Sequence, residues 1–189
     1  MRTEELWQTR IRQKVIDRKF TPRIRRDIGI IPPPEGLPET ITEGVYLYSD
    51  TGFGKTIYAA FLLLQEERYM YLNNISGETI MVSVPELFQT IKNTYDNKYL
   101  HEADVLRKYC NVRLLVLDDF GVMKPTDWVA EIMYMIVNYR WENLLPTIYT
   151  SNKSLKEMAI FLGDDRIVSR IERAGKVVKK KHYSKNENT

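Results

Sequence analysis

The chain has 189 residues, of which 43% are hydrophobic and 28% charged, a balance typical of one globular domain with short appendages and unlike that of a disordered chain. Its formal charge of +3 is too small by itself to identify a nucleic-acid-binding protein. One cysteine and two histidines exclude an internal disulfide and argue against a structural zinc site. Because no run of about 18 apolar residues occurs, we expect a cytoplasmic protein without a membrane partner.

The first segment, residues 1–43, is expected to hold a basic amphipathic helix and a linker. Trp7, Ile11 and Val15 recur every four residues among arginines and lysines, which predicts a helix over residues 4–19 with a basic outer face. The proline-rich stretch 30–38 cannot form regular helix or a central strand. It therefore indicates a linker into the core.

Residues 44–178 are expected to form an α/β core, because short apolar runs alternate there with helical periodicity. This alternation predicts a mostly parallel sheet flanked by helices. Strands are expected at residues 45–48, 79–83, 112–117 and 147–150, and helices at 55–67, 85–95, 128–141 and 155–161. Residues 179–189 are polar and are expected to be a basic, flexible tail.

A phosphate-binding loop is predicted where the first strand gives way to a helix. Its residues, expected to bind ATP, are Ser49, Asp50, Thr51, Gly52, Phe53, Gly54, Lys55, Thr56 and Ile57. In such a loop backbone N–H groups surround phosphate oxygens, the lysine reaches the β and γ phosphates, and the threonine hydroxyl ligates Mg²⁺. Ser49 stands where the usual pattern has glycine. Since serine accepts a positive φ less readily, nucleotide affinity is expected to suffer.

Polar residues also follow the third and fourth strands of the predicted core. Asp118 and Asp119 follow the apolar run 114–117, and at this distance after a phosphate-binding loop they are expected to hold Mg²⁺ and to polarise the attacking water, respectively. Read alone, such a pair is more often a helix cap or a turn. Asn152 follows the strand at 147–150, and the alternative reading is that Asn152 or Ser154 merely caps the next helix.

Arg166 and Arg170 lie four residues apart, so a helix would present both on the same side. An arginine donated across a subunit boundary neutralises charge that develops on a transferred phosphate. The alternative is a solvated basic face paired with Asp165 or Glu172.

Together these segments resemble the DnaC/DnaI helicase loaders and the related IstB transposition ATPases of the AAA+ class of P-loop NTPases. The resemblance covers roughly residues 44–178. It implies Mg²⁺-dependent ATP hydrolysis, Asn152 as the sensor of the γ phosphate and lytic water, Arg170 as an arginine finger with Arg166 as its companion, an ATP-dependent homo-oligomer, and contact with single-stranded DNA. Typical loaders carry a larger N-terminal module; since about 43 residues precede the core here, we expect the part that grips a helicase to be reduced to one basic helix, and we expect no separate helical lid.

Three functions stay open at this point: a loader of a replicative DNA helicase, a transposition helper acting on duplex DNA beside a transposase, or a nucleotide-dependent binding module or decoy subunit without turnover. The basic N-terminal helix is the candidate for helicase capture. Candidate DNA contacts mix basic and aromatic side chains, with a merely solvated surface as the alternative: Lys92, Lys98, Arg107, Lys108, Tyr95 and Tyr99.

Overall fold

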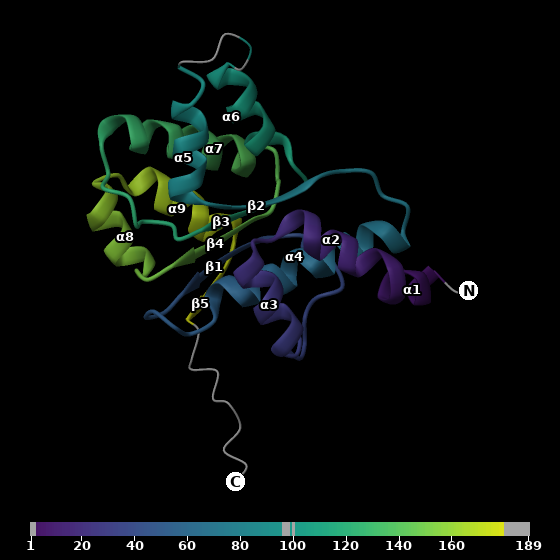
Figure 1. The fold of residues 1–189 in the computed structure, drawn as a ribbon. Helices are drawn as coiled ribbons and strands as arrows, with labels where there is room; N and C mark the ends of the chain where they lie inside the picture. The colour runs from purple at the N-terminus through teal and green to yellow at the C-terminus, as the bar shows by residue number, and fades with distance from the viewer. Residues whose placement is uncertain (1–2, 96–98, 100, 180–189) are drawn as a thin grey trace.

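The computed structural model describes residues 3–95, 99 and 101–179 and contains a parallel sheet between two layers of helices (Figure 1). The five strands pair in the order β2-β3-β4-β1-β5, and every pairing is parallel. Their bounds are β1 Gly44–Tyr48, β2 Thr79–Ser83, β3 Leu114–Asp118, β4 Thr147–Ser151 and β5 Gly175–Lys179. The predicted fold class is confirmed.

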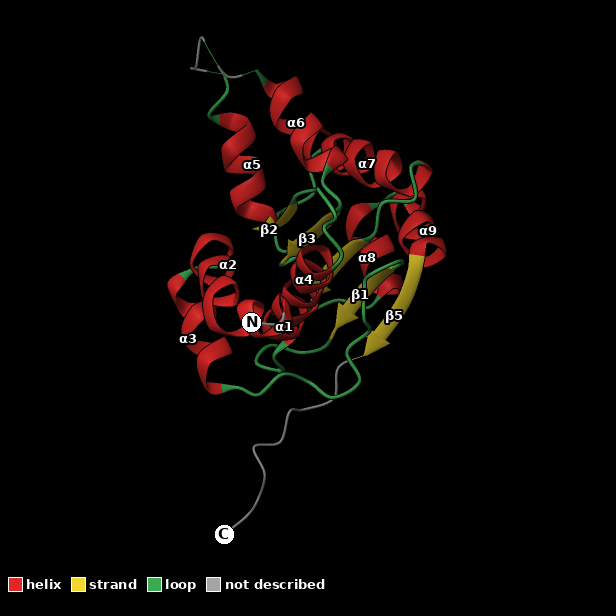
Figure 2. Cartoon of the chain, turned by 90° about the vertical axis from the view of Figure 1, so that its right-hand side faces the viewer, coloured by secondary structure: helices red, strands yellow, loops and turns green. Residues whose placement is uncertain are grey.

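Two groups of helices cover the two faces of the sheet (Figure 2). One face is covered by α4 (Lys55–Leu72), on which lie α1 (Thr3–Leu6), the π-helix η1 (Trp7–Ile11), α2 (Arg12–Lys19) and α3 (Pro22–Ile30). The other is covered by α5 (Val84–Lys92), α6 (Glu102–Asn111), α7 (Asp127–Glu142), α8 (Leu155–Leu162) and α9 (Asp165–Ala174). Within the described residues no helix is both long and apolar enough to cross a membrane.

Local sequence signals explain where several helices begin. Ser83 and Thr126 accept hydrogen bonds from the backbone N–H groups of Glu86 and Val129, which caps α5 and α7. Ser154 forms a capping box with Glu157 at the start of α8. Because these side chains satisfy N–H groups that the first helical turn leaves without partners, the helices start at the capped positions.

Four elements of the structure were not predicted as such. Residues 3–30, which we call the N-terminal arm, contain a π-helical turn and a second helix, α3, that begins at Thr21 and Pro22. Helix α6 follows α5, and β5 adds an edge strand beside β1. The partner of the amphipathic arm is α4, whose core cluster includes Ile16, Phe20 and Ile28 of the arm.

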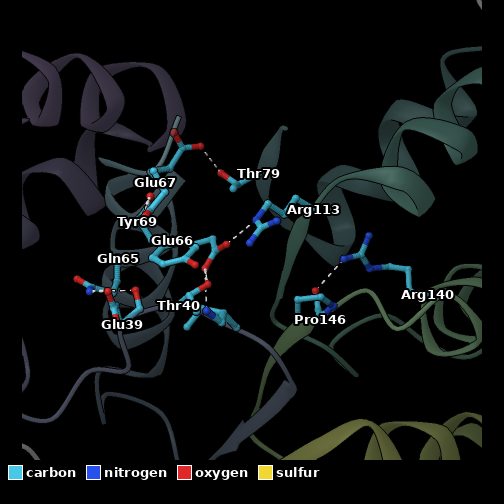
Figure 3. Close-up of polar contacts among 12 residues, drawn as sticks. Glu39, Thr40, Gln65, Glu66, Glu67, Tyr69, Thr79, Arg113, Arg140 and Pro146 are labelled. Atoms are coloured by element: carbon cyan, nitrogen blue, oxygen red, sulfur yellow. Dashed lines mark hydrogen bonds and ion pairs between the residues drawn. The ribbon is translucent and has the colours of Figure 1, made fainter. Parts of the chain in front are cut away.

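Carboxylates on α4 connect the arm, the linker and the sheet (Figure 3). Glu66 is fully buried and accepts hydrogen bonds from the Thr40 hydroxyl and the Ile41 N–H, each at 2.7 Å, and from Arg113 Nε at 2.6 Å. Glu67 accepts from the Thr79 hydroxyl at 2.6 Å. The helix that follows the phosphate-binding loop therefore also holds the linker in front of β1 and the segment in front of β3.

Arg140 of α7 performs a similar task on the other face of the sheet. It is 1% exposed and donates to Thr147 Oγ1 at 2.7 Å, to the Pro146 carbonyl at 2.7 Å and to the Val112 carbonyl at 2.8 Å. Burial lowers its pKa to about 10. The guanidinium joins α7 to the segments that lead into β3 and β4.

Candidate nucleotide-binding site

Alternation along the parallel strands brings the predicted site residues to one face and one edge of the sheet. Successive side chains of a strand point to opposite faces. Val116 packs in the cluster beneath α4, whereas Leu117 packs in the cluster beneath α5 to α9, so Asp118 returns to the α4 face. Ile148 of β4 also packs beneath α4, so Thr150 points the same way, toward the loop between β1 and α4.

The loop from Ser49 to Gly54 turns through two glycines with a left-handed backbone. Gly52 has φ +89° and Gly54 has φ +72°, and a Cβ on either would meet no atom within 4 Å. Glycine is therefore needed here for backbone conformation. Ser49 is not among the described residues with positive φ, so the expectation that serine would strain the loop at this position is wrong.

Lys55 lies inside the loop, 8% exposed. Its ammonium donates to the carbonyl oxygens of Ser49 and Asp50, each at 2.8 Å. Burial lowers its pKa, and the nearby carboxylates of Asp119, Asp118 and Asp50 oppose that shift. The ammonium also donates to the Ser49 hydroxyl at 3.3 Å. A lysine whose hydrogen-bond acceptors in a buried loop are all uncharged suits an anionic ligand, because phosphate oxygens carry the charge that these acceptors lack.

Thr56 and Asp118 meet beside this lysine. Thr56 Oγ1 donates to Asp118 Oδ1 at 2.9 Å, and Thr150 Oγ1 donates to the same oxygen at 2.5 Å. Burial raises the pKa of Asp118, while the hydrogen bonds from Thr150 and Thr56 lower it. Two predicted metal ligands thus come together, with Thr150 as an additional partner.

Asp119 occupies an unusual backbone conformation at the end of β3. Its φ is +59°, a left-handed value that is uncommon for a residue with a side chain. Its N–H donates to Thr150 Oγ1 at 3.0 Å, and the next N–H, of Phe120, donates to the Thr150 carbonyl at 2.7 Å. These bonds hold the turn that exposes the Asp119 carboxylate.

Asn152 lies one residue beyond β4 and faces the phosphate-binding loop. Its Nδ2 is 3.5 Å from Thr51 Oγ1. The adjacent Ser151 accepts the Ser49 N–H through its carbonyl at 3.3 Å. The cap of α8 is Ser154, so the capping alternative does not apply to Asn152.

Arg166 and Arg170 lie on α9 and contact α7 instead of the loop of their own chain. Arg170 donates through Nε to Asn138 Oδ1 and through Nη2 to the Tyr134 hydroxyl at 3.1 Å. Arg166 pairs with Asp164 at 2.8 Å, not with Asp165 or Glu172, and both guanidinium groups lie over the Tyr134 ring at 4.7 and 4.9 Å. The pair is held together, apart from Lys55 and Asp118.

Some other predicted residues lie beside the loop, at the end of α5 or outside the described residues. Ile57 is half-buried and packs in the core beneath α4, and Phe53 is half-buried in the loop. Lys92 lies 5.7 Å over the ring of Trp128, and Tyr95 is 60% exposed with its ring 6.5 Å from the same indole. Lys98 and residues 180–189 lie outside the described residues.

Thr150 is the site residue that the sequence analysis missed. It stands in the same Thr-Ser-Asn segment as Asn152, of which only the last residue was predicted to belong to the site. The available signal was the parity of β4: Thr150 lies two positions after Ile148, on the face that Asp118 also occupies.

The described residues fit a magnesium–nucleotide complex. They contain no group of three or more histidine, cysteine, aspartate or glutamate side chains that could hold a metal alone. Mg²⁺ in phosphate-transfer sites takes only one or two protein ligands and completes its shell with water and phosphate oxygens. The Thr56 hydroxyl and the Asp118 carboxylate, adjacent to Lys55 and the two loop glycines, provide that set.

A parallel sheet with this loop between a strand and a helix defines a P-loop nucleotide-binding domain of the AAA+ class. Residues 36–179 match the family described as the bacterial DnaA ATPase domain. The chain belongs to this family.

Relatives and solved structures agree with this placement. The chain is 29% identical over 98 residues to the replicative helicase loader DnaC of Escherichia coli (strain K12), a match that covers 51% of this chain and 40% of DnaC. A crystal structure of the DnaC helicase loader superposes with a TM-score of 0.60 at 27% identity, covering 84% of this chain and 86% of that one. A crystal structure of DnaI gives 0.58 at 25% identity, covering 86% and 80%. The chain thus matches less than half the length of the curated DnaC.

Proposed function

We propose that this chain is an ATP-hydrolysing loader that places or remodels a replicative DNA helicase during replication. The observation that carries the proposal is the meeting of Thr56 Oγ1 and Asp118 Oδ1 at 2.9 Å beside the buried Lys55. This is the arrangement that a P-loop ATPase needs for its nucleotide and metal. Likeness to DnaC and DnaI favours the loader over the transposition helper.

Each site residue has a defined task in the proposed reaction. Lys55 and the N–H groups of the loop bind the β and γ phosphates, while Thr56 and Asp118 hold Mg²⁺. When bound, Mg²⁺ neutralises charge on the phosphate oxygens. Asp119, exposed at the turn after β3, orients and polarises the attacking water. Asn152, next to Thr51, senses the γ phosphate and that water.

The arginines of α9 act in this proposal on the nucleotide of a neighbouring subunit. Their side chains contact α7 and Asp164, so neither arginine reaches the P-loop of its own chain. A finger supplied by a second copy stabilises the charge of the transferred phosphate. Arg170 is the finger, Arg166 its companion, and ATP binding assembles the homo-oligomer.

Single-stranded DNA is the proposed nucleic-acid ligand, at the surface where α5 meets α7. Lys92, Tyr95 and Trp128 lie together there. Exposed aromatic rings stack on bases and basic side chains pair with phosphates, without a preference for sequence. Arg107 and Lys108, exposed on the neighbouring α6, extend the positive charge, although Arg107 also pairs with Asp104 at 3.6 Å.

The proposal is tested by nucleotide binding and turnover measured on the same material. Calorimetry of the full chain with Mg²⁺ and ATP should show binding that Lys55→Ala abolishes. Asp119→Asn should retain binding and lose turnover, because the residue acts on water and not on the nucleotide. Turnover should be measured alone and with single-stranded DNA and a replicative helicase. Binding without turnover under every condition would favour the decoy subunit, and no binding at all would refute the ATPase proposal.

A further inference from the structure

The outer face of the N-terminal arm carries three basic side chains one helical turn apart: Arg10, Lys14 and Arg18. All three are exposed. Within the described part of the chain none of them forms a side-chain hydrogen bond or an ion pair. Side chains four residues apart on a helix stand next to one another, about 6 Å apart. We call this row the basic stripe.

The opposite face of the arm is fixed to the core, so the stripe cannot turn inward. Trp7 and Ile16 are 2% and 3% exposed. Glu4 accepts two hydrogen bonds from Arg68 of α4, at 3.0 and 2.8 Å. At the other end of the arm Lys19 donates to the Thr79 carbonyl at 2.6 Å and pairs with Glu67 at 3.2 Å.

Most carboxylates of the arm already have basic partners. Asp17, which flanks the stripe, pairs with Arg25 at 3.6 Å, and Asp27 pairs with Arg26 at 2.9 Å. Glu4 is taken by Arg68. Among residues 3–30 this leaves Glu5 as the carboxylate without an ion pair. The outer face of the arm therefore presents positive charge that its own acids do not neutralise.

We propose that the basic stripe binds the phosphate backbone of nucleic acid. The exposed residues between its members, Gln13 and Asp17, and those just before it, Gln8 and Thr9, are all polar. The centres of protein interfaces are rich in aromatic residues, methionine and arginine and depleted in lysine. No exposed aromatic residue or methionine lies between the arginines and the lysine of the stripe, so this face fits nucleic acid better than a protein partner. Interfaces with DNA are polar and strongly positive, and phosphate contacts from arginine and lysine supply affinity without sequence preference.

The arm that carries the stripe and the helix that carries the proposed DNA surface, α5, both adjoin the edge strand β2. The inference rests on the proposed function for the kind of ligand. Lys19, the residue after Arg18, contacts Thr79 at the start of β2. Helix α5 begins where β2 ends, at Ser83 and Val84. Figure 2 shows α2 and α5 on either side of this edge strand. Lys92 is the last residue of α5, so a single strand that contacts both surfaces would run along α5 and across β2 to the arm.

The test removes two charges from the stripe and two from elsewhere. Lys14→Gln/Arg18→Gln is compared with Lys156→Gln/Arg173→Gln, whose lysine and arginine are also exposed and without ion pairs among the described residues. Binding of a labelled thymidine oligonucleotide to the full chain is followed by anisotropy across a salt series, without nucleotide. The stripe variant should lower the slope of log affinity against log salt by roughly 0.7 for each lost contact, and the control should leave it unchanged.

Three results would overturn the inference: an unchanged slope in the stripe variant, an equal fall in the control, or tighter binding of a polyglutamate peptide than of the oligonucleotide. The last result would make the stripe a surface for acidic proteins. Because none of the four substituted side chains forms a side-chain hydrogen bond or an ion pair among the described residues, both variants should keep the wild-type melting temperature. The variant Lys92→Gln tests DNA binding by the α5 surface separately, and calorimetry with ATP tests nucleotide binding by the P-loop. A wrong inference about the stripe can therefore be distinguished from a wrong proposed function.

Discussion

At the scale of a single residue, the Thr150 hydroxyl forms hydrogen bonds with both acidic residues at the end of β3. It donates to the Asp118 carboxylate at 2.5 Å and accepts the Asp119 N–H at 3.0 Å. Thr150→Val keeps the shape of the side chain and its preference for strands but removes both bonds. Loss of such an outer partner of a metal ligand typically costs 10- to 100-fold in activity or metal affinity. We therefore expect turnover to fall by about that factor, and the Mg²⁺ concentration for half-maximal turnover to rise.

Thr150→Ser is the matched control for this prediction, because serine restores the hydroxyl without the methyl group. It should recover most of the turnover and the wild-type Mg²⁺ dependence. Unfolding in urea should show that Thr150→Val costs no more than about 1–3 kcal/mol, the usual range for a buried polar group left without its partner. Wild-type Mg²⁺ dependence in Thr150→Val would contradict the assigned role.

Helix α4 acts as an element that joins three parts of the chain, and Glu66 is where they meet. It accepts from Thr40, Ile41 and Arg113 while fully buried. Glu66→Gln removes the charge and one acceptor oxygen, so we expect a loss of about 3 kcal/mol in the free energy of unfolding, as for other broken buried ion pairs. Urea denaturation measures this loss.

The neighbouring Gln65 provides the comparison for Glu66. Its side chain donates to the Glu39 carbonyl at 3.3 Å in an exposed position, so Gln65→Ala should change the free energy of unfolding by less than about 0.5 kcal/mol. Equal losses in the two variants would show that Glu66 does not hold the linker and β3 together.

At the same scale, the sequence predicts elements well where a local signal is strong and less well where tertiary contacts decide. The strand before Lys55 and the acidic end of β3 were placed correctly, because loop chemistry and apolar runs mark them. Strand β5 was missed although residues 175–178 fall within the predicted core, because only two apolar residues stand between its lysines; it becomes a strand only by pairing with β1. Thr21 and Pro22 are a local signal for the start of α3, as N-cap and first helical residue. The docking of the arm on α4 has no such signal, because it depends on contacts distant in sequence, such as Lys19 with Thr79.

At the scale of the whole molecule, the separation of Arg170 from Lys55 predicts that activity needs two copies. A chain with Arg170→Ala retains a complete P-loop, and a chain with Lys55→Ala retains a complete finger. Each variant alone should lose turnover, since each assembly lacks one half of every site. In an equal mixture about one quarter of the interfaces would combine an intact P-loop with an intact finger if the copies mix randomly in a head-to-tail assembly.

The mixture should therefore regain up to about a quarter of wild-type turnover, because complementation across an interface requires one intact group from each partner. The double variant Lys55→Ala/Arg170→Ala, mixed with either single variant, offers no interface with both groups and should stay inactive.

Arg170→Ala also removes the contacts with Tyr134 and Asn138, so its melting temperature must be measured beside its turnover. If folded Arg170→Ala hydrolyses ATP like the wild type, Arg170 is not the finger. If the two single variants mixed together are no more active than apart, the site does not lie between subunits, and α9 holds its arginines only to pack against α7.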